Sequence, residues 1–421
     1  MQLDQSWLVA QGEDARLIGL IHAECRSAVV EGGIAVAVSG GGDSMALLHV
    51  MSRWAHKVGV QLWAVTVDHG LRDEAVAEAE AVADFCDDIW VAHETLRWTT
   101  WDGHGNVQAQ ARTARYKLMA DWAAENGIET IILGHTLDDV AETFVMRLAR
   151  KAGIDGLALM DRVFSRHGLV WHRPLLTVQR NQLRDYLKRN AVAWIDDPSN
   201  ENVDFERIRV RKALAHLAEL GVTLPVLHHS GMAVRQARDA LEHYTRAEAE
   251  RYISTHDGDL VLADVAHLPV EMKRRLFAKA IGWVGGLGYP PRATTLQHLN
   301  EGLVLSGTAT AAGCLVVKEG TALRIMREPN AVRMTVCKTD EIWDGRWSLS
   351  GPHADDLRVR ALGEGIASCP DWRETGLPRA SLMASPAIWR GDVLVSAPIA
   401  GYSQGWAARI VADFHSSLVA H

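Results

Sequence analysis

The sequence contains few cysteines, and their spacing does not suggest metal binding. Five cysteines occur among 421 residues, they lie far apart, and none forms a Cys-x-x-Cys pair. We therefore expect neither a zinc or iron–sulfur site nor a disulfide framework. Reduced and mostly buried thiols are the expected state of these residues.

The sequence also lacks a hydrophobic stretch that would cross a membrane. It contains no run of roughly 18 or more apolar residues. Acidic residues interrupt the first part of the chain, which does not fit the pattern of a secretion signal. Hydrophobic residues make up 48% and charged residues 23%, which is ordinary for a globular protein. We expect a cytoplasmic protein with no membrane partner.

The chain as a whole has no excess of positive charge, but its middle segment does. The net charge is -8. Residues 1–146 carry 9 Lys/Arg against 22 Asp/Glu, residues 147–212 carry 14 against 8, and residues 213–421 carry 21 against 22. The total charge disfavours a nucleic-acid partner, whereas the basic middle is typical of a localised phosphate-binding surface. A solvated helical face is the alternative.

Strands and helices alternate in the first part of the chain. Apolar runs predict strands at 34–38, 61–67, 89–96 and 130–133. The segments between and after them predict helices at 45–54, 75–86, 107–126 and 137–150. This alternation predicts an α/β fold with a parallel sheet that is covered on both faces. Ligands of such sheets bind beyond the carboxyl ends of the strands, where glycine and polar residues gather here.

The character of the sequence changes after a basic helix expected at 205–220. A charged, alanine-rich helix is expected at 235–255, and beyond residue 340 glycine, proline and tryptophan punctuate short apolar runs. We predict three domains: a catalytic domain at 1–215, a mainly helical middle domain at 216–335, and a small α+β C-terminal domain at 336–421.

The segment Ser39–Ser44 reads Ser-Gly-Gly-Gly-Asp-Ser and follows the first predicted strand. Three glycines let backbone N–H groups approach a phosphate, and the start of the next helix attracts an anion. Asp43 would repel phosphates unless it holds Mg²⁺ or orients a cation on them. The Gly-Lys-Ser/Thr of a Walker loop is absent, so transfer of the γ-phosphate is not indicated. A glycine turn without a ligand is the alternative.

This loop resembles the PP-loop of the N-type ATP pyrophosphatases, a superfamily with an adenine nucleotide alpha hydrolase-like fold. These enzymes cleave ATP between the α- and β-phosphates and adenylate an oxygen of the substrate. Further motifs resemble the tRNA(Ile)-lysidine synthetase family within it. They are Val67-Asp68-His69-Gly70-Leu71-Arg72, Ala111-Arg112-x-x-Arg115-Tyr116, Gly134-His135-Thr136-Leu137-Asp138-Asp139-Val140-Ala141-Glu142-Thr143, and Arg173-Pro174-Leu175-Leu176 followed by residues 194–200. The chain departs from the family pattern at Ile208, where an amide is usual, and at Asp68, where histidine is common.

The resemblance implies a specific reaction. ATP adenylates the C2 oxygen of the first anticodon cytidine of tRNA(Ile) with a CAU anticodon, and free L-lysine then displaces AMP. ATP and Mg²⁺ are the implied cofactors. A homodimer is left open.

The expected catalytic residues are carboxylates from two of the motifs, namely Asp43, Asp138, Asp139 and Glu142, with Mg²⁺ at Asp43 and Asp139. Asp138 and Glu142 are spaced i,i+4, so they share one helix face and can bracket the lysine ammonium. Capping the helix and solvating its first turn is the alternative for both.

The expected nucleotide site comprises Ser39, Gly40, Gly41, Gly42, Asp43, Ser44, His69, Arg72, Gly134 and His135. The expected tRNA-binding residues are Arg112, Arg115, Arg173, Arg207, Arg209 and Arg211. Ordinary packing is the alternative for the histidines, and simple exposure to solvent is the alternative for the arginines.

Three other functions stay open from the sequence alone. A tRNA 2-thiolation enzyme needs a cysteine pair near the loop, which Cys25 and Cys86 do not supply. A small-molecule amidating ligase such as an NAD synthetase leaves the basic middle segment and the additional domains unexplained. An inactive tRNA-binding module is disfavoured by the intact Asp43 and Asp138-Asp139.

Overall fold

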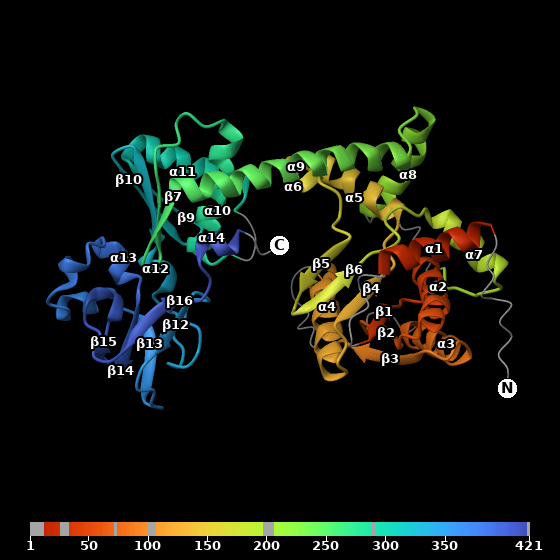
Figure 1. Ribbon diagram of the computed structural model, residues 1–421, viewed down its shortest axis with the longest axis horizontal. Helices are drawn as coiled ribbons and strands as arrows, with labels where there is room; N and C mark the ends of the chain where they lie inside the picture. The colour runs from red at the N-terminus through yellow and green to blue at the C-terminus, as the bar shows by residue number, and fades with distance from the viewer. Residues whose placement is uncertain are drawn as a thin grey trace. The chain divides into compact units, whose positions relative to one another are not determined.

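The computed structural model of the chain describes residues 12–25, 33–70, 74–99, 107–196, 206–287 and 291–418. The chain forms two compact units, Met1–Arg238 and Asp239–His421 (Figure 1). Within the described ranges, no helix has the length and apolar character needed to cross a membrane.

The first unit is built on a six-stranded sheet with the order β3-β2-β1-β4-β6-β5. Its strands are β1 (Ile34–Ala37), β2 (Leu62–Asp68), β3 (Ala92–Arg97), β4 (Thr130–Leu133), β5 (Val163–Arg166) and β6 (Leu169–His172). Every neighbouring pair is parallel except β5 and β6, which form an antiparallel hairpin at one edge. The predicted parallel α/β sheet is therefore confirmed, and β5 is an additional strand that the sequence analysis did not predict.

Helices cover both faces of this sheet. The helices of this unit are α1 (Glu13–Cys25), α2 (Gly42–Val58), α3 (Glu74–Asp88), α4 (Val107–Glu125), α5 (Leu137–Ala149), α6 (Ile154–Leu157), α7 (Arg180–Arg189) and α8 (Glu206–Glu219), and α9 (Leu224–Tyr252) begins in it. Ile34 and Val36 of β1 pack with α1, α2, α3 and α7. Ala35, between them, packs with α4. Successive residues of a strand point to opposite faces, so the apolar run of β1 serves both cores.

The basic helix α8 packs against α5 at the end of the first unit. Ala141 of α5 and Leu214 of α8 are buried in one apolar cluster, together with Leu227 of α9. This contact holds the polar first turns of α5 and α8 close together.

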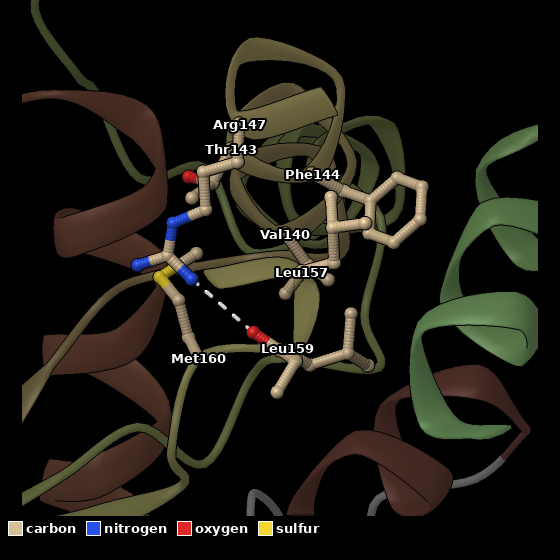
Figure 2. A pocket seen from close by; sticks show the side chains of 8 residues that line it. Val140, Thr143, Phe144, Arg147, Leu157, Leu159 and Met160 are labelled. Carbon is tan, nitrogen blue, oxygen red and sulfur yellow. Dashed lines mark hydrogen bonds between the residues drawn. The ribbon is translucent and has the colours of Figure 1, made fainter. Parts of the chain in front are cut away.

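A shallow hollow also lies beside α5 and α6 (Figure 2). Val140, Phe144 and Leu159 line it, and Arg147 donates from Nη1 to the carbonyl oxygens of Gly156 (2.9 Å) and Ala158 (3.2 Å). None of the predicted site residues lines this hollow. The shape of this surface therefore does not locate the predicted site.

The second unit contains a five-stranded sheet with the order β7-β8-β11-β10-β9 and two smaller sheets, β12-β16 and β13-β14-β15. The strands are β7 (Ile253–His256), β8 (Asp259–Leu262), β9 (Thr308–Ala311), β10 (Cys314–Glu319), β11 (Ala322–Arg327), β12 (Trp347–Ser350), β13 (Leu357–Ala361), β14 (Pro386–Arg390), β15 (Val393–Ser396) and β16 (Ala407–Ile410). The helices are α10 (Val270–Gly285), α11 (Ala293–Ser306), α12 (Pro329–Val332), α13 (Arg379–Met383) and α14 (Phe414–Ser417). Strands thus occur within residues 216–335, where the sequence indicated mainly helix. The division into three domains stays a prediction.

Candidate active site

The glycine loop connects β1 to α2 and has a fixed conformation. Gly40 has a φ of +78°, and a Cβ added there would lie 2.8 Å from the Cδ1 atom of Ile195. The positive φ strongly favours glycine at this position, and a larger residue would also displace the end of the Ile195 side chain. Ser44 Oγ accepts a hydrogen bond from the Ser39 N–H at 3.1 Å and donates one to the Gly41 carbonyl at 2.9 Å. The two serines therefore hold the loop in shape at the amino end of α2.

The turn after β4 lies directly against this loop. A Cβ at Gly134 would lie 3.3 Å from both the Asp43 carbonyl oxygen and the Ser44 Cα atom. A side chain here would press on the backbone of the loop, so glycine favours this close approach of the two backbones. The contact places His135 and the first turn of α5 beside the loop, so two of the predicted motifs meet at one edge of the sheet.

Two carboxylates in the first turn of α5 make different contacts. Asp139 Oδ2 accepts hydrogen bonds from the Thr136 N–H at 2.9 Å and the Thr136 hydroxyl at 3.0 Å. Asp139 therefore caps its own helix with one oxygen. Asp138 Oδ2 instead accepts a hydrogen bond of 2.8 Å from the backbone N–H of Arg180, the first residue of α7.

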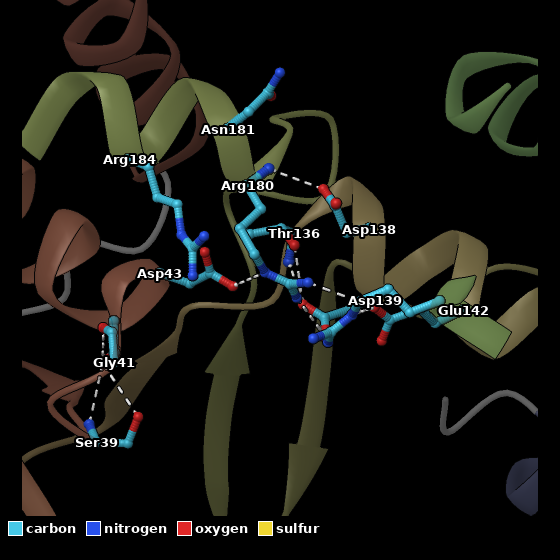
Figure 3. A network of polar contacts seen from close by, with 12 residues as sticks. Ser39, Gly41, Asp43, Thr136, Asp138, Asp139, Glu142, Arg180, Asn181 and Arg184 are labelled. Carbon is cyan, nitrogen blue, oxygen red and sulfur yellow. Dashed lines mark hydrogen bonds and ion pairs between the residues drawn. The ribbon is translucent and has the colours of Figure 1, made fainter. Parts of the chain in front are cut away.

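Arg180 is the central cation of the site, and the sequence analysis did not assign it a role (Figure 3). Its Nε donates to Asp43 Oδ2 at 2.8 Å, and its Nη1 donates to Glu142 Oε1 at 3.4 Å. Its Nη2 lies 3.7 Å from Asp139 Oδ1. Arg180 and Asp43 are 137 positions apart in the chain, and no local pattern links them. The only feature of the sequence that pointed to this region was the nearby motif Arg173-Pro174-Leu175-Leu176.

Glu142 lies among three arginines, and its side chain is only 1% exposed. Besides Arg180, Arg211 Nε donates to Oε1 at 2.9 Å, and Arg207 Nε lies 3.0 Å from Oε2. Oε1 of Glu142 thus accepts hydrogen bonds, whereas Oε2 makes an ion pair without a hydrogen bond. Two of the three α8 arginines expected to bind tRNA therefore face a carboxylate of the site, whereas Arg209 is exposed on α8.

Burial and charge shift the protonation equilibria of the site. Burial raises the pKa of Asp43, Arg180 opposes this shift, and Asp139 adds to it. Burial alone would also raise the pKa of Asp139, but His135, Arg207, the Thr136 N–H and Arg180 together outweigh burial, so this pKa is lowered. Burial lowers the pKa of His135 to about 3, so its imidazole is neutral at physiological pH.

The donors available for Mg²⁺ are Asp43 and Asp139. In the described part of the chain, no group of three or more His, Cys, Asp or Glu side chains could hold a metal ion by itself. Mg²⁺ at phosphate sites usually takes one or two carboxylates and completes its shell with phosphate oxygens and water. Asp43 Oδ1 is buried and lacks a hydrogen-bond partner among the described residues, which suits a metal ligand. The residues therefore fit a metal that binds together with a nucleotide.

His69 follows β2 at the same edge of the sheet. Its ring packs edge-on against Trp98 with 5.9 Å between the ring centroids. Burial and the nearby Arg115 lower its pKa. The predicted Arg72 lies outside the described residues, as do residues 197–200 of the last motif.

Four arginines gather around two aromatic rings near His135, and three of them were predicted. They are Arg112, Arg115, Arg166 and Arg173. The guanidinium carbons of Arg112, Arg115 and Arg166 lie 5.4, 5.6 and 4.4 Å from the centre of the Tyr116 ring. Arg173 lies 4.2 Å from the centre of the Phe164 ring. None of the four forms an ion pair with a carboxylate of the described ranges, so this cluster suits an anionic ligand.

The two cysteines nearest the loop in sequence are unsuited to sulfur transfer. Cys25 and Cys86 are both buried free thiols. Burial raises the pKa of each thiol to about 12, so neither is a reactive thiolate.

The sequence is similar to those of known proteins. Residues 19–218 match the family described as a PP-loop domain. The chain is 44% identical over 394 residues to the tRNA(Ile)-lysidine synthase of Ruegeria pomeroyi, which covers 92% of this chain and 94% of that protein. It is 34% identical over 336 residues to the tRNA(Ile)-lysidine synthase of Wolbachia pipientis wMel, covering 77% and 78%. Among solved structures, a U34-tRNA thiolase from Methanococcus maripaludis matches 54% of this chain and 78% of that chain, with 14% identity and a TM-score of 0.46.

Proposed function

The chain belongs to the tRNA(Ile)-lysidine synthase family, and from this premise we propose that it joins free L-lysine to C2 of a cytidine in tRNA(Ile). The cytidine is the first residue of a CAU anticodon, and the products are lysidine, AMP and pyrophosphate. The observation that carries the proposal is the convergence of Asp43, Asp138, Asp139 and Glu142 beside the glycine loop.

The first step is adenylation of the cytidine. The C2 oxygen attacks the α-phosphorus of ATP, and the bond to the β-phosphate breaks to release pyrophosphate. The backbone N–H groups of the loop and the amino end of α2 bind the leaving pyrophosphate, because they present partial positive charge. Mg²⁺, held by Asp43 and Asp139, would neutralise phosphate charge when bound.

The second step is attack by lysine. Its ε-amine forms a bond to C2, the bond from C2 to the adenylated oxygen breaks, and AMP leaves. The amine is protonated in water, so it has to lose a proton before it attacks. Asp138 and Glu142 bracket the amine in this proposal. Three arginines contact Glu142, so its charge is already balanced. Asp138 accepts only one hydrogen bond from the described residues, at Oδ2, so it is the carboxylate placed to accept this proton.

The tRNA-binding surface combines two groups of arginines. The cluster of Arg112, Arg115 and Arg173 lies near His135, and Arg207, Arg209 and Arg211 lie on α8. Both groups present guanidinium groups suited to phosphate oxygens. The homodimer and the cytoplasmic location stay predictions.

The test is mass spectrometry of nucleosides from tRNA(Ile) after incubation with ATP, Mg²⁺ and isotope-labelled lysine. We expect labelled lysidine in place of one cytidine, with pyrophosphate released in equal amount. Asp138→Asn should abolish the product or raise the KM for lysine. The control is Asp121→Asn, because Asp121 is exposed on α4 and pairs only with Lys117 at 2.7 Å among the described residues.

Other outcomes would point to other functions. Incorporation of labelled sulfide in place of lysine would indicate a thiolation enzyme. Release of γ-phosphate in place of pyrophosphate would contradict the assignment of the loop. Binding of tRNA without any ATP–pyrophosphate exchange would indicate an inactive module.

A further inference from the structure

We propose that Arg180 binds the phosphates of the nucleotide and that Asp43 holds its guanidinium in position to do so. The proposal rests on the proposed function, because it takes ATP as the ligand. It adds a residue from α7 to a site that the sequence placed only on the glycine loop and on the ends of β2 and β4.

The position of Asp43 requires a cation. Asp43 lies in the first turn of α2, where the loop offers its N–H groups to phosphate. A carboxylate there repels the negative charges of ATP unless a positive group stands between them. Arg180 is such a group, because its Nε donates to Asp43 Oδ2 at 2.8 Å.

Arg180 keeps unused donors in this arrangement. A guanidinium has five N–H groups in a rigid planar fork. Among the described residues, the side chain of Arg180 donates one hydrogen bond to Asp43 and one to Glu142. Its Nη2 lies 3.7 Å from Asp139 Oδ1, which is an ion pair beyond hydrogen-bond length. The Nη2 hydrogens therefore remain for phosphate oxygens, and the 18% exposed side chain keeps access to the site.

Asp43 can position Arg180 and a metal ion at the same time. Its Oδ2 accepts the Arg180 hydrogen bond, whereas Oδ1 is buried and lacks a partner within the described part of the chain. One carboxylate thus orients an arginine with one oxygen and offers the other oxygen to Mg²⁺. Both cations would face the same triphosphate, which explains why an acidic residue is useful in a phosphate-binding loop.

The side chain and the backbone of Arg180 serve different ligands. The side chain contacts Asp43, on the nucleotide side, at 2.8 Å and reaches Glu142 only at 3.4 Å, whereas the backbone N–H contacts Asp138, on the lysine side. A substitution at position 180 removes the side-chain contacts and keeps the backbone hydrogen bond to Asp138, and Glu142 keeps its closer contacts with the two arginines of α8. This separation predicts that nucleotide binding and lysine binding respond differently to the same variant.

The experiment measures binding of α,β-methylene-ATP with Mg²⁺ to the full chain by calorimetry, without tRNA or lysine. Arg180→Gln should weaken binding by about 10- to 100-fold, as expected for the loss of a charge-assisted hydrogen bond. Arg180→Lys should recover part of this loss, because it restores the charge without the planar fork. In the complete reaction, the KM for ATP should rise in Arg180→Gln, and the KM for lysine should stay close to that of the wild type.

Arg184→Gln is the matched control. Arg184 lies one turn further along α7 and pairs with the exposed Asp196 at 2.8 Å. Its loss should leave affinity for the nucleotide analogue unchanged.

The outcomes separate this inference from the proposed function. If the wild type binds the analogue and Arg180→Gln binds it equally well, the role of Arg180 is refuted and the proposed function stands. If the wild type binds no analogue, the proposed function fails instead. If Arg180→Gln does not fold, Arg180→Lys decides the matter: equal increases in the KM for ATP and for lysine would overturn the inference.

Discussion

Removing the negative charge of Glu142 should reduce the free energy that holds α8 in place more than removing any exposed ion pair of that helix. Glu142→Gln keeps the size of the side chain and removes its negative charge. In the wild type this carboxylate, 1% exposed, contacts Arg211 at 2.9 Å, Arg207 at 3.0 Å and Arg180 at 3.4 Å. Two of these arginines belong to α8, so their contacts with Glu142 hold that helix against α5.

The size of the effect follows from burial. Breaking a buried ion pair by removing one partner costs about 3–5 kcal/mol. The side chains of Arg207 and Arg211 are 42% and 38% exposed, so water partly solvates them once the charge of Glu142 is gone. An exposed pair contributes only about 0–1 kcal/mol. We therefore expect the free energy that holds α8 in place to fall by about 2–3 kcal/mol in Glu142→Gln.

Amide hydrogen exchange of the α8 segment measures this quantity directly. A protein with two compact units does not have to unfold in one step, so a local measurement is preferable to a single melting temperature. We expect α8 amides to exchange about 30- to 140-fold faster in Glu142→Gln, since about 1.4 kcal/mol corresponds to a factor of ten.

Glu206→Gln is the control for this measurement. Glu206 also lies on α8 but makes an exposed ion pair with Arg150. Its loss should change exchange by less than about fivefold. Wild-type protection of α8 in Glu142→Gln would refute the reasoning that this carboxylate fastens the helix.

Three further predictions concern pH, the loop and tRNA. Burial and Arg53 lower the pKa of His49 to about 4. Below about pH 6.5 the unfolded chain therefore binds a proton at this histidine that the folded chain does not bind, so the free energy of unfolding falls as the pH drops. His49→Gln should therefore flatten the decrease of the melting temperature between about pH 7 and about pH 5. Gly40→Ala should cost about 1–3 kcal/mol and abolish nucleotide binding measured by calorimetry, because of the positive φ and the 2.8 Å approach to Ile195. The affinity for tRNA(Ile), measured by filter binding, should fall steeply between about 50 and about 200 mM salt, and Arg209→Gln should reduce that slope; a flat response would refute phosphate contacts.

The sequence was sufficient to predict the sheet and the loop because their signals are local. Strand β4 begins and ends where the apolar run Thr130–Leu133 does, and the glycine loop follows β1 as expected. Periodicity and glycine spacing report backbone conformations that depend mainly on residues close together in the sequence. Strand β5 was missed because it is a four-residue edge strand with a half-exposed pattern, which resembles a loop in the sequence.

The partners of the carboxylates could not be predicted, because they depend on contacts distant in the sequence. The hydrogen bonds of Glu142 to Arg180 and Arg211 span 38 and 69 positions. The sequence presented Arg207 and Arg211 as members of a basic segment, and i,i+4 spacing indeed puts them on one face of α8. This face of α8 meets α5 because Ala141 of α5 and Leu214 of α8 pack in one apolar cluster. No local sequence pattern indicates such a contact.

The charge balance of the site explains why these distant arginines matter. Four carboxylates, Asp43, Asp138, Asp139 and Glu142, would together repel a triphosphate strongly. Arg180, Arg207 and Arg211 face three of them and leave the cluster with a net charge of only one negative before any ligand binds. A nearly neutral site can accept an anionic nucleotide first and a cationic amine later, since neither ligand meets a large opposing field. A site made of the carboxylates alone would favour the amine and exclude the nucleotide, so the arginines of α7 and α8 are as necessary to the proposed order of chemistry as the acidic residues of the motifs.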